Sequence, residues 1–64
     1  MNPEQEAPLR LLVVDDQELL RRGLRMLLES TGAVTVVAEA RDGAHALTLL
    51  REEPVDAVLT DVVM

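Results

Sequence analysis

A run of four aliphatic residues that ends at two adjacent carboxylates constrains the fold of this chain most strongly. Leu11 to Val14 are all branched aliphatic residues without polar alternation, and Asp15 and Asp16 follow directly. Such a run is typical of a strand that is buried on both faces, as strands of parallel sheets are. In open α/β sheets the ligand crevice lies beyond the carboxyl ends of the strands. The two acids are therefore predicted to lie in that crevice.

A second apolar run later in the chain also ends at a carboxylate. Residues 57–61 read AVLTD, and if this strand lies parallel to the first, Asp61 comes to the same end of the sheet as Asp15 and Asp16. Unpaired carboxylates at short distance repel one another, and a bound Mg²⁺ ion would remove that cost. The three acids therefore indicate Mg²⁺-assisted phosphoryl transfer with one carboxylate as the nucleophile, and their spacing does not say which one. The alternative is that these residues only cap helices or begin turns.

The remaining hydrophobic pattern predicts strands and helices in alternation. We expect strands over residues 9–14, 34–38 and 55–60, and helices over residues 17–30 and 43–52. Asp16 and Asp42 are the expected N-caps of the two helices, because aspartate is favoured at that position. The order β-α-β-α-β with short connections predicts an α/β fold with parallel strands and right-handed crossovers.

Each predicted helix carries one apolar face. The residues expected to point inward are Leu20, Leu24, Leu27 and Leu28 in the first helix, and Ala46, Leu47 and Leu50 in the second. The arginines are expected on the solvated faces of the helices.

Size and charge restrict the class of protein. The chain has 64 residues, no cysteine and no aromatic residue, so we expect one marginally stable domain without disulfides or a thiolate metal site. Its formal net charge of −6 makes nucleic acid and anionic membranes poor partners. No apolar stretch reaches the roughly 20 residues that a membrane span needs, and no leader is recognisable, so we expect a cytoplasmic protein. Residues 1–8 are expected to form a disordered tail, and residues 9–64 the domain.

Three segments of the chain match a known pattern, and they read LLVVDDQELLRRGLRMLLE, VVAEARDGAHAL and PVDAVLTDVVM. Together they resemble the receiver domain of bacterial two-component response regulators, in particular of regulators that carry a LuxR-type helix-turn-helix output domain. The resemblance covers residues 9–64 without a gap. It implies a flavodoxin-like fold, with a three-stranded parallel sheet of order 2-1-3 in this part, and a role in signal transduction and transcription regulation in the parent protein.

The resemblance also implies roles for individual residues. Asp61 is the expected phosphoacceptor, which takes a phosphoryl group from a sensor histidine kinase. Asp16, Asp61 and the backbone carbonyl of Val63 are the expected ligands of a weakly bound Mg²⁺ ion, and Asp15 is expected to act on that ion through water. The implied protein is a phosphoacceptor regulator and not an enzyme.

Two residues of the family pattern have no counterpart among these 64 residues. They are the Ser or Thr that follows the fourth strand and the lysine that follows the fifth, and the chain contains no lysine. We therefore expect the amino-terminal half of a receiver, unable to switch and without direct binding of nucleic acid. The third strand would keep one edge unpaired, which predicts a homodimer or a strand-exchanged oligomer through that edge.

Two other functions remain open from the sequence. One is an interaction module, a shortened receiver that pairs with other chains and is never phosphorylated. The other is an aspartate-nucleophile phosphohydrolase, in which the acid after the first strand attacks. Its two acids are usually separated by one residue, whereas Asp15 and Asp16 are adjacent, so this function is disfavoured.

Overall fold

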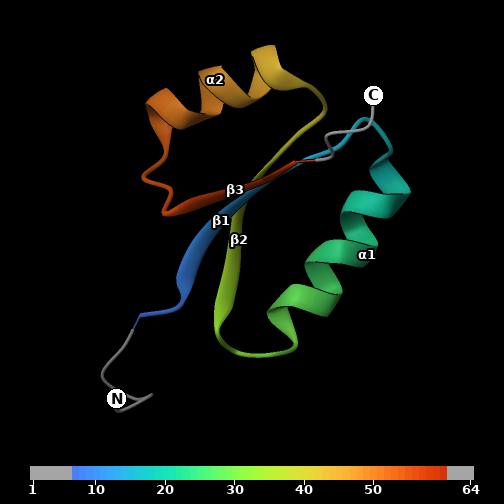
Figure 1. Cartoon of the computed structure of the whole chain (residues 1–64), viewed down its shortest axis with the longest axis vertical. Helices are drawn as coiled ribbons and strands as arrows, with labels where there is room; N and C mark the ends of the chain where they lie inside the picture. Colours follow the sequence, from blue (N-terminus) through green and yellow to red (C-terminus); the bar gives the residue numbers. More distant parts are fainter. Residues whose placement is uncertain (1–6, 61–64) are drawn as a thin grey trace.

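Five elements alternate along the chain in the computed structural model, which describes residues 7–60 (Figure 1). They are the strands β1 (Leu9–Val14), β2 (Val34–Ala40) and β3 (Ala57–Thr60) and the helices α1 (Glu18–Glu29) and α2 (Gly43–Glu52). The strands form one parallel sheet in the order β2-β1-β3. This confirms the predicted fold class and strand order. Most of the expected tail, residues 1–6, lies outside the described residues.

The central strand β1 pairs with both other strands, and its register with them sets which residues lie together at the carboxyl end of the sheet. Along β3, Leu11 lies opposite Ala57 and Val14 lies opposite Thr60, so β1 and β3 end at the same level. Along β2 the register shifts by one residue between Leu11 and Leu12. Asp61 follows Thr60 in the sequence and lies outside the described residues.

The two helices cover opposite faces of the sheet (Figure 1). Alternate β1 residues point to opposite faces, and two separate core clusters result. On the α1 face, Leu24 and Leu28 pack against the buried cluster of Leu11, Val13 and Val36. On the α2 face, the cluster is formed by Leu12, Ala40 and Ala46, with Leu49 and Val55 packed against it.

Two predicted strand boundaries were wrong by two residues. The second strand continues to Ala40, because β1 offers it a pairing partner as far as Val14. The third strand begins at Ala57, since Asp56 before it pairs with Arg10 partly through its side chain. The Arg10 N–H donates to Asp56 Oδ2 at 2.8 Å, and the Asp56 N–H donates to the Arg10 carbonyl at 2.8 Å. The bounds predicted for the first strand and the second helix are confirmed.

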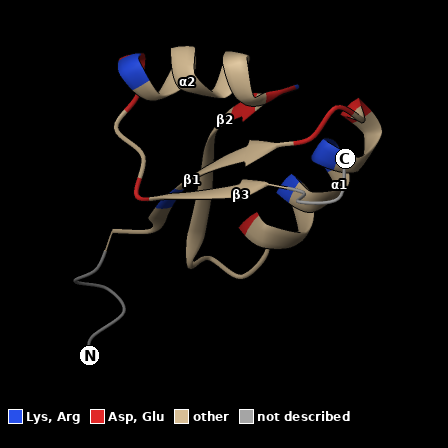
Figure 2. Cartoon of the chain, turned by 45° about the horizontal axis from the view of Figure 1, so that its top comes forward, with Lys and Arg blue, Asp and Glu red and all other residues tan. Residues whose placement is uncertain are grey.

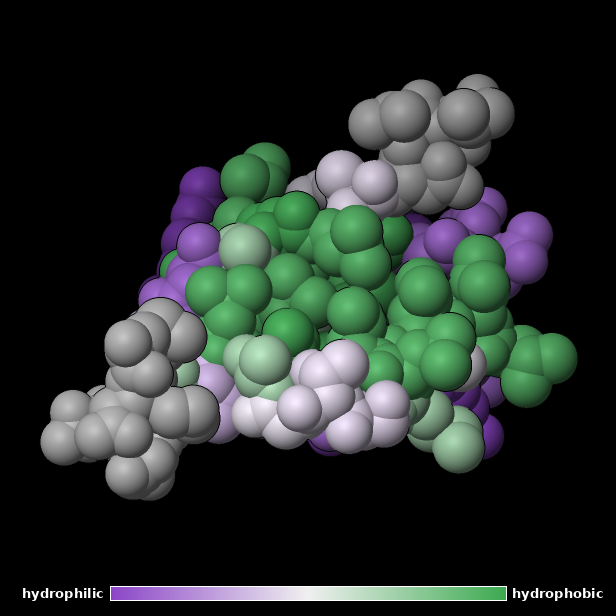
Figure 3. Space-filling model, turned by 60° about the horizontal axis from the view of Figure 1, so that its bottom comes forward, coloured by the Kyte–Doolittle hydropathy of each residue, from purple (hydrophilic) through white to green (hydrophobic). Residues whose placement is uncertain are grey.

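The predicted apolar faces of the helices were broader than the faces that are buried. In α2, Ala46 and Leu49 point inward, whereas Leu47 is 61% exposed and Leu50 is 39% exposed. In α1, Leu27 is exposed and Leu20 is only half covered. A three-stranded sheet is narrow. It therefore covers only the side chains at the middle of each apolar helix face, and the apolar side chains at the margins of that face stay exposed. Figure 3 shows one side of the molecule, over much of which hydrophobic residues gather.

The N-cap of α2 is formed by Asp42, as predicted. Its Oδ1 accepts a hydrogen bond from the His45 N–H at 2.8 Å. We expect Asp42→Ala to lower the free energy of unfolding by about 1 kcal/mol, because an N–H at the helix start loses its partner. Urea unfolding followed by circular dichroism measures this change. Asp42→Asn keeps an acceptor oxygen and serves as the control, and equal stability of the alanine variant and the unsubstituted chain would contradict the assignment.

Candidate functional site

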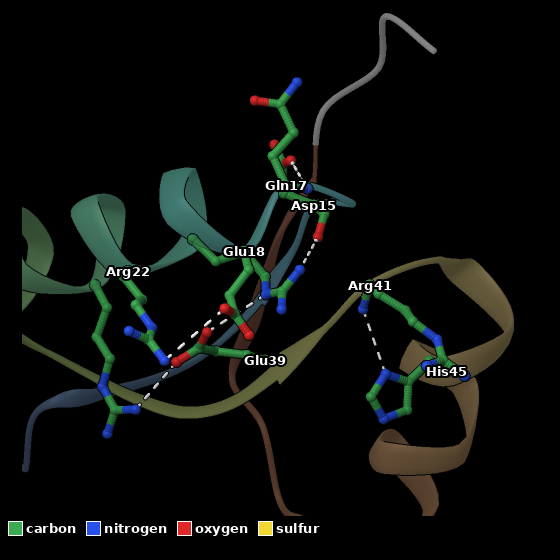
Figure 4. Close-up of polar contacts among 9 residues, drawn as sticks. Asp15, Gln17, Glu18, Arg22, Glu39, Arg41 and His45 are labelled. Atoms are coloured by element: carbon green, nitrogen blue, oxygen red, sulfur yellow. Dashed lines mark hydrogen bonds and ion pairs between the residues drawn. The ribbon is translucent and has the colours of Figure 1, made fainter.

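Asp15 is the buried member of the acidic pair at the carboxyl end of β1. It is only 8% exposed, and its N–H donates to the Ala40 carbonyl at 3.0 Å. Its Oδ1 accepts a hydrogen bond from the Gln17 N–H at 2.8 Å (Figure 4). An aspartate side chain that bonds the backbone two residues further on closes a tight turn. Asp15 therefore shapes the β1–α1 loop and brings a carboxylate to the end of the sheet.

Asp16 does not cap α1, so that prediction was wrong. The N-cap residue is Gln17, whose side chain makes no capping hydrogen bond, and Asp16 lies one position before it. The turn made by Asp15 starts the helix one residue later than expected, which takes Asp16 out of the capping position. Asp16 is exposed and makes no hydrogen bond or ion pair with another of residues 7–60.

The described part of the site suits a hard divalent cation. Figure 2 shows acidic residues at the carboxyl end of β1, close to where β3 ends. Oxygen donors of this kind are the ligands that Mg²⁺ prefers. Within residues 7–60, no group of three or more acidic or histidine side chains is placed to hold a metal ion. The other two predicted ligands, Asp61 and the Val63 carbonyl, lie outside that range.

Arg21 is the residue of this region that the sequence analysis missed. It was expected on a solvated helix face, but its side chain is only 14% exposed. Its Nη1 donates to the Asp15 carbonyl at 2.5 Å, and its Nε lies 3.4 Å from Glu39 Oε1. No local sequence pattern could have found it, because its partner Glu39 lies 18 residues further along the chain.

Glu39 links Arg21 to a second arginine one turn further along α1. Arg25 Nη1 donates to Glu39 Oε2 at 3.0 Å, and Arg25 Nε donates to Glu29 Oε1 at 3.4 Å. The hydrogen bonds to Glu39 and then to Glu29 raise the pKa of Arg25 above its usual value. Glu29 Oε2 in turn accepts from the Val36 N–H at 2.9 Å. This network of charges connects α1 to β2.

An apolar cavity of about 240 Å³ lies between β1, β3 and α1. Its lining comprises Val13, Val14, Asp15, Leu20, Leu24, Leu59 and Thr60. The lining is mostly hydrophobic, and Asp15 is the one charged residue among the described residues that line it.

The class of protein follows from a parallel α/β sheet with an acidic pair after its central strand, and comparison with known families confirms it. The model of the response regulator receiver domain matches residues 11–64. The chain belongs to this family, as the sequence predicted. Among the described residues there is no helix with the length and apolarity that crossing a bilayer requires.

Curated relatives agree with the family match. The chain is 43% identical over 60 residues to the nitrate/nitrite response regulator protein NarP of Escherichia coli, which covers 94% of this chain and 28% of that protein. It is 39% identical over 56 residues to the transcriptional regulatory protein LiaR of Bacillus subtilis, covering 88% of this chain and 26% of that protein. A protein-glutamate methylesterase/protein-glutamine glutaminase of Symbiobacterium thermophilum is 41% identical over 64 residues, which is 18% of its length. The chain thus spans little more than a quarter of these relatives at most. No solved structure matched significantly.

Proposed function

We propose that this chain is the phosphoacceptor part of a response regulator receiver, in which Asp61 takes a phosphoryl group from a sensor histidine kinase. The observation that carries the proposal is the common level at which β1 and β3 end, with Val14 opposite Thr60. Asp15 and Asp61 are the next residues of the two strands in the sequence. In the transfer, a carboxylate oxygen of Asp61 forms a bond to phosphorus while the bond between phosphorus and the kinase imidazole breaks.

Two described acids support this chemistry in different ways. Asp16 is exposed and unpaired among residues 7–60, so it can bind a cation directly together with Asp61 and the Val63 carbonyl. Asp15 already uses Oδ1 for the Gln17 N–H, which fits the expected contact through water made by its other oxygen. A bound Mg²⁺ ion would neutralise the charge that develops on the phosphoryl oxygens.

The proposal extends to the protein from which these residues come. We propose a cytoplasmic regulator of transcription with a LuxR-type output domain, controlled by phosphorylation and without an enzymatic activity of its own. The relatives named as response or transcriptional regulators support this reading. The similarity to a methylesterase favours an enzyme as the parent protein instead. The sequence that accompanies the receiver in the parent would decide between a transcription regulator and an enzyme. The 64-residue chain contains no lysine, so we propose that its phosphorylation produces no second conformation.

Incubation of the chain with a small acyl phosphate tests the phosphoacceptor role directly. We expect the intact mass to increase by one phosphoryl group in the presence of Mg²⁺ and not after the ion has been removed by chelation. Hydroxylamine should release the group, because an acyl phosphate is cleaved by this nucleophile. A folded chain that remains unlabelled at saturating Mg²⁺ would favour the interaction module over the phosphoacceptor.

A second proposal concerns assembly, and the edge of β3 supports it. Among residues 7–60, β3 pairs with β1 along one edge and with no other strand. Val58 and Leu59 are both partly exposed there. An open apolar edge recruits a further strand. We propose that the 64-residue chain forms a symmetric dimer, in which two β3 strands pair across a two-fold axis, or exchanges strands in the same place.

Sedimentation at micromolar concentration measures this assembly. We expect a dimer for the unsubstituted chain and a shift toward the monomer for Val58→Lys, because a lysine on an edge strand opposes pairing. Leu47→Lys makes the same change at an exposed position of α2 and should leave the dimer intact. A compact, folded monomer of the unsubstituted chain would show that the β3 edge is not the interface.

A further inference from the structure

Arg21 connects the loop that carries the acidic pair to the second strand. We propose that Arg21 is a positioning residue, which holds Asp15 and Asp16 in the arrangement that binds the cation. The inference rests on the proposed Mg²⁺ site, because it assigns a role to a residue that supports that site without contacting the ion. Three observations carry it: the hydrogen bond to the loop backbone, the pairing with Glu39, and the burial of the guanidinium.

The hydrogen bond fixes the peptide unit between the two acids. Arg21 Nη1 donates to the carbonyl oxygen of Asp15, and that carbonyl belongs to the planar unit that ends at the nitrogen of Asp16. The N–H of Asp15 donates to Ala40, and its Oδ1 accepts from Gln17. All three kinds of polar group in Asp15 are therefore engaged. Because the peptide plane is fixed, the direction in which the Asp16 side chain leaves the loop is restricted as well.

Glu39 keeps the guanidinium in place. Its Oε1 lies 3.4 Å from Arg21 Nε, and its Oε2 accepts from Arg25 at 3.0 Å. The pairing offsets part of the cost of burying a charged group. The rest of that cost persists, since Arg21 Nε is buried and makes no hydrogen bond with any described residue. A buried charge of this kind is weak evidence that a residue stabilises the fold. We therefore attribute the burial of Arg21 to its effect on the position of the loop.

The next residue in the sequence provides a matched comparison. Arg22 is 70% exposed and lies 3.9 Å from Glu18 on the outer face of α1. It has the same side chain, the same helix and the same type of acidic partner as Arg21, and it makes no contact with the loop. Substitution of Arg22 therefore measures the general effect of removing one positive charge from α1.

The sign of the effect on Mg²⁺ binding separates positioning from simple electrostatics. A guanidinium near a cation site repels the cation, so the loss of its charge alone would tighten Mg²⁺ binding. The loss of a residue that orients the ligands weakens binding instead. Residues that support metal ligands typically contribute ten-fold or more in affinity, so we expect Arg21→Gln to raise the Kd for Mg²⁺ about ten-fold.

The experiment is a Mg²⁺ titration of the 64-residue chain, monitored by amide chemical shifts. Arg21→Gln should bind Mg²⁺ about ten-fold more weakly than the unsubstituted chain, and Arg22→Gln should not bind it more weakly. A second readout needs no metal: the Gln17 amide, whose N–H is bonded to Asp15, should exchange with solvent faster in Arg21→Gln and not in Arg22→Gln. If Arg21→Gln does not fold, Glu39→Gln replaces it, because it keeps Arg21 and removes the charge that holds it.

The outcomes distinguish this inference from the proposed function. If the unsubstituted chain binds Mg²⁺ and Arg21→Gln binds it equally well or more tightly, the positioning role is wrong and the site stands. If the unsubstituted chain does not bind Mg²⁺, the proposed site is wrong. In that case, the exchange of the Gln17 amide still tests the positioning role. Equally slow exchange in Arg21→Gln and in the unsubstituted chain would overturn that role. Faster exchange in Arg21→Gln would support control of the loop by Arg21.

Discussion

Replacement of Asp61 by asparagine should abolish the uptake of a phosphoryl group by this chain. An amide has nearly the shape of the carboxylate but lacks the anionic oxygen that attacks phosphorus. The expected result is an intact mass that does not change during incubation with an acyl phosphate and Mg²⁺, under conditions that label the unsubstituted chain. The amide spectrum of the variant should show a folded β1, so that the loss of labelling reflects chemistry and not unfolding.

Asp56→Asn is the control for this experiment. Asp56 is an exposed acid five residues before Asp61, and its Oδ2 accepts a hydrogen bond from the Arg10 N–H. The substitution removes the same charge and keeps an acceptor, so labelling should persist. If Asp61→Asn is labelled as fully as the unsubstituted chain, another carboxylate is the nucleophile. Peptide mapping would then locate the group, and a label on Asp15 or Asp16 would favour the phosphohydrolase.

Leu12→Ala is expected to have the largest effect on stability. Leu12 is 0% exposed, lies in the central strand and joins β1 to Ala40 and Ala46 in the core cluster under α2. Truncation of a buried leucine to alanine costs about 2–5 kcal/mol. For a chain of 64 residues, this approaches the whole free energy of unfolding that a single small core supplies. We therefore expect the variant to be mostly unfolded at 25 °C, measured by circular dichroism and urea titration.

Leu27→Ala is the matched control for this prediction. Leu27 is on α1 and 69% exposed, so the same truncation there should change the free energy of unfolding by no more than about 0.5 kcal/mol. If both variants lose the same free energy, Leu12 is not at the centre of the core, or Leu27 is covered in the assembled protein. Sedimentation of Leu27→Ala separates these two explanations.

The sequence predicted those parts of the fold that depend on hydrophobic pattern. The strand Leu9–Val14, the N-cap Asp42 and the order of the elements depend on neighbouring residues, and they are confirmed. The resemblance to receivers supplied the strand order, which local pattern alone does not define. The exposure of Leu27 and Leu47 was not predictable, because it depends on the width of the sheet and not on either helix.

The candidate site was predicted less completely than the fold. The acidic character of the loop after β1 is a property of the sequence, but the role of each acid depends on where the helix begins. A shift of one residue made Gln17 the N-cap and released Asp16 from capping. The burial of Arg21 depends on a contact with Glu39, 18 residues away in the sequence, that no local pattern reveals. The roles of Asp61 and Val63 lie outside the described residues and stay predictions.

The register shift between β1 and β2 decides on which side of the sheet Glu39 lies. Val36 belongs to the α1 cluster, and Ala38 packs with the α2 cluster, although two residues apart in a regular strand share a side. The one extra residue reverses the parity of every β2 position after it. Glu39 is thereby opposite Val13 and meets the arginines of α1. In an unshifted strand it would be opposite Val14 and would lie on the far side of the sheet. One irregular residue pair therefore makes the ion pairs between Glu39 and the arginines of α1 possible.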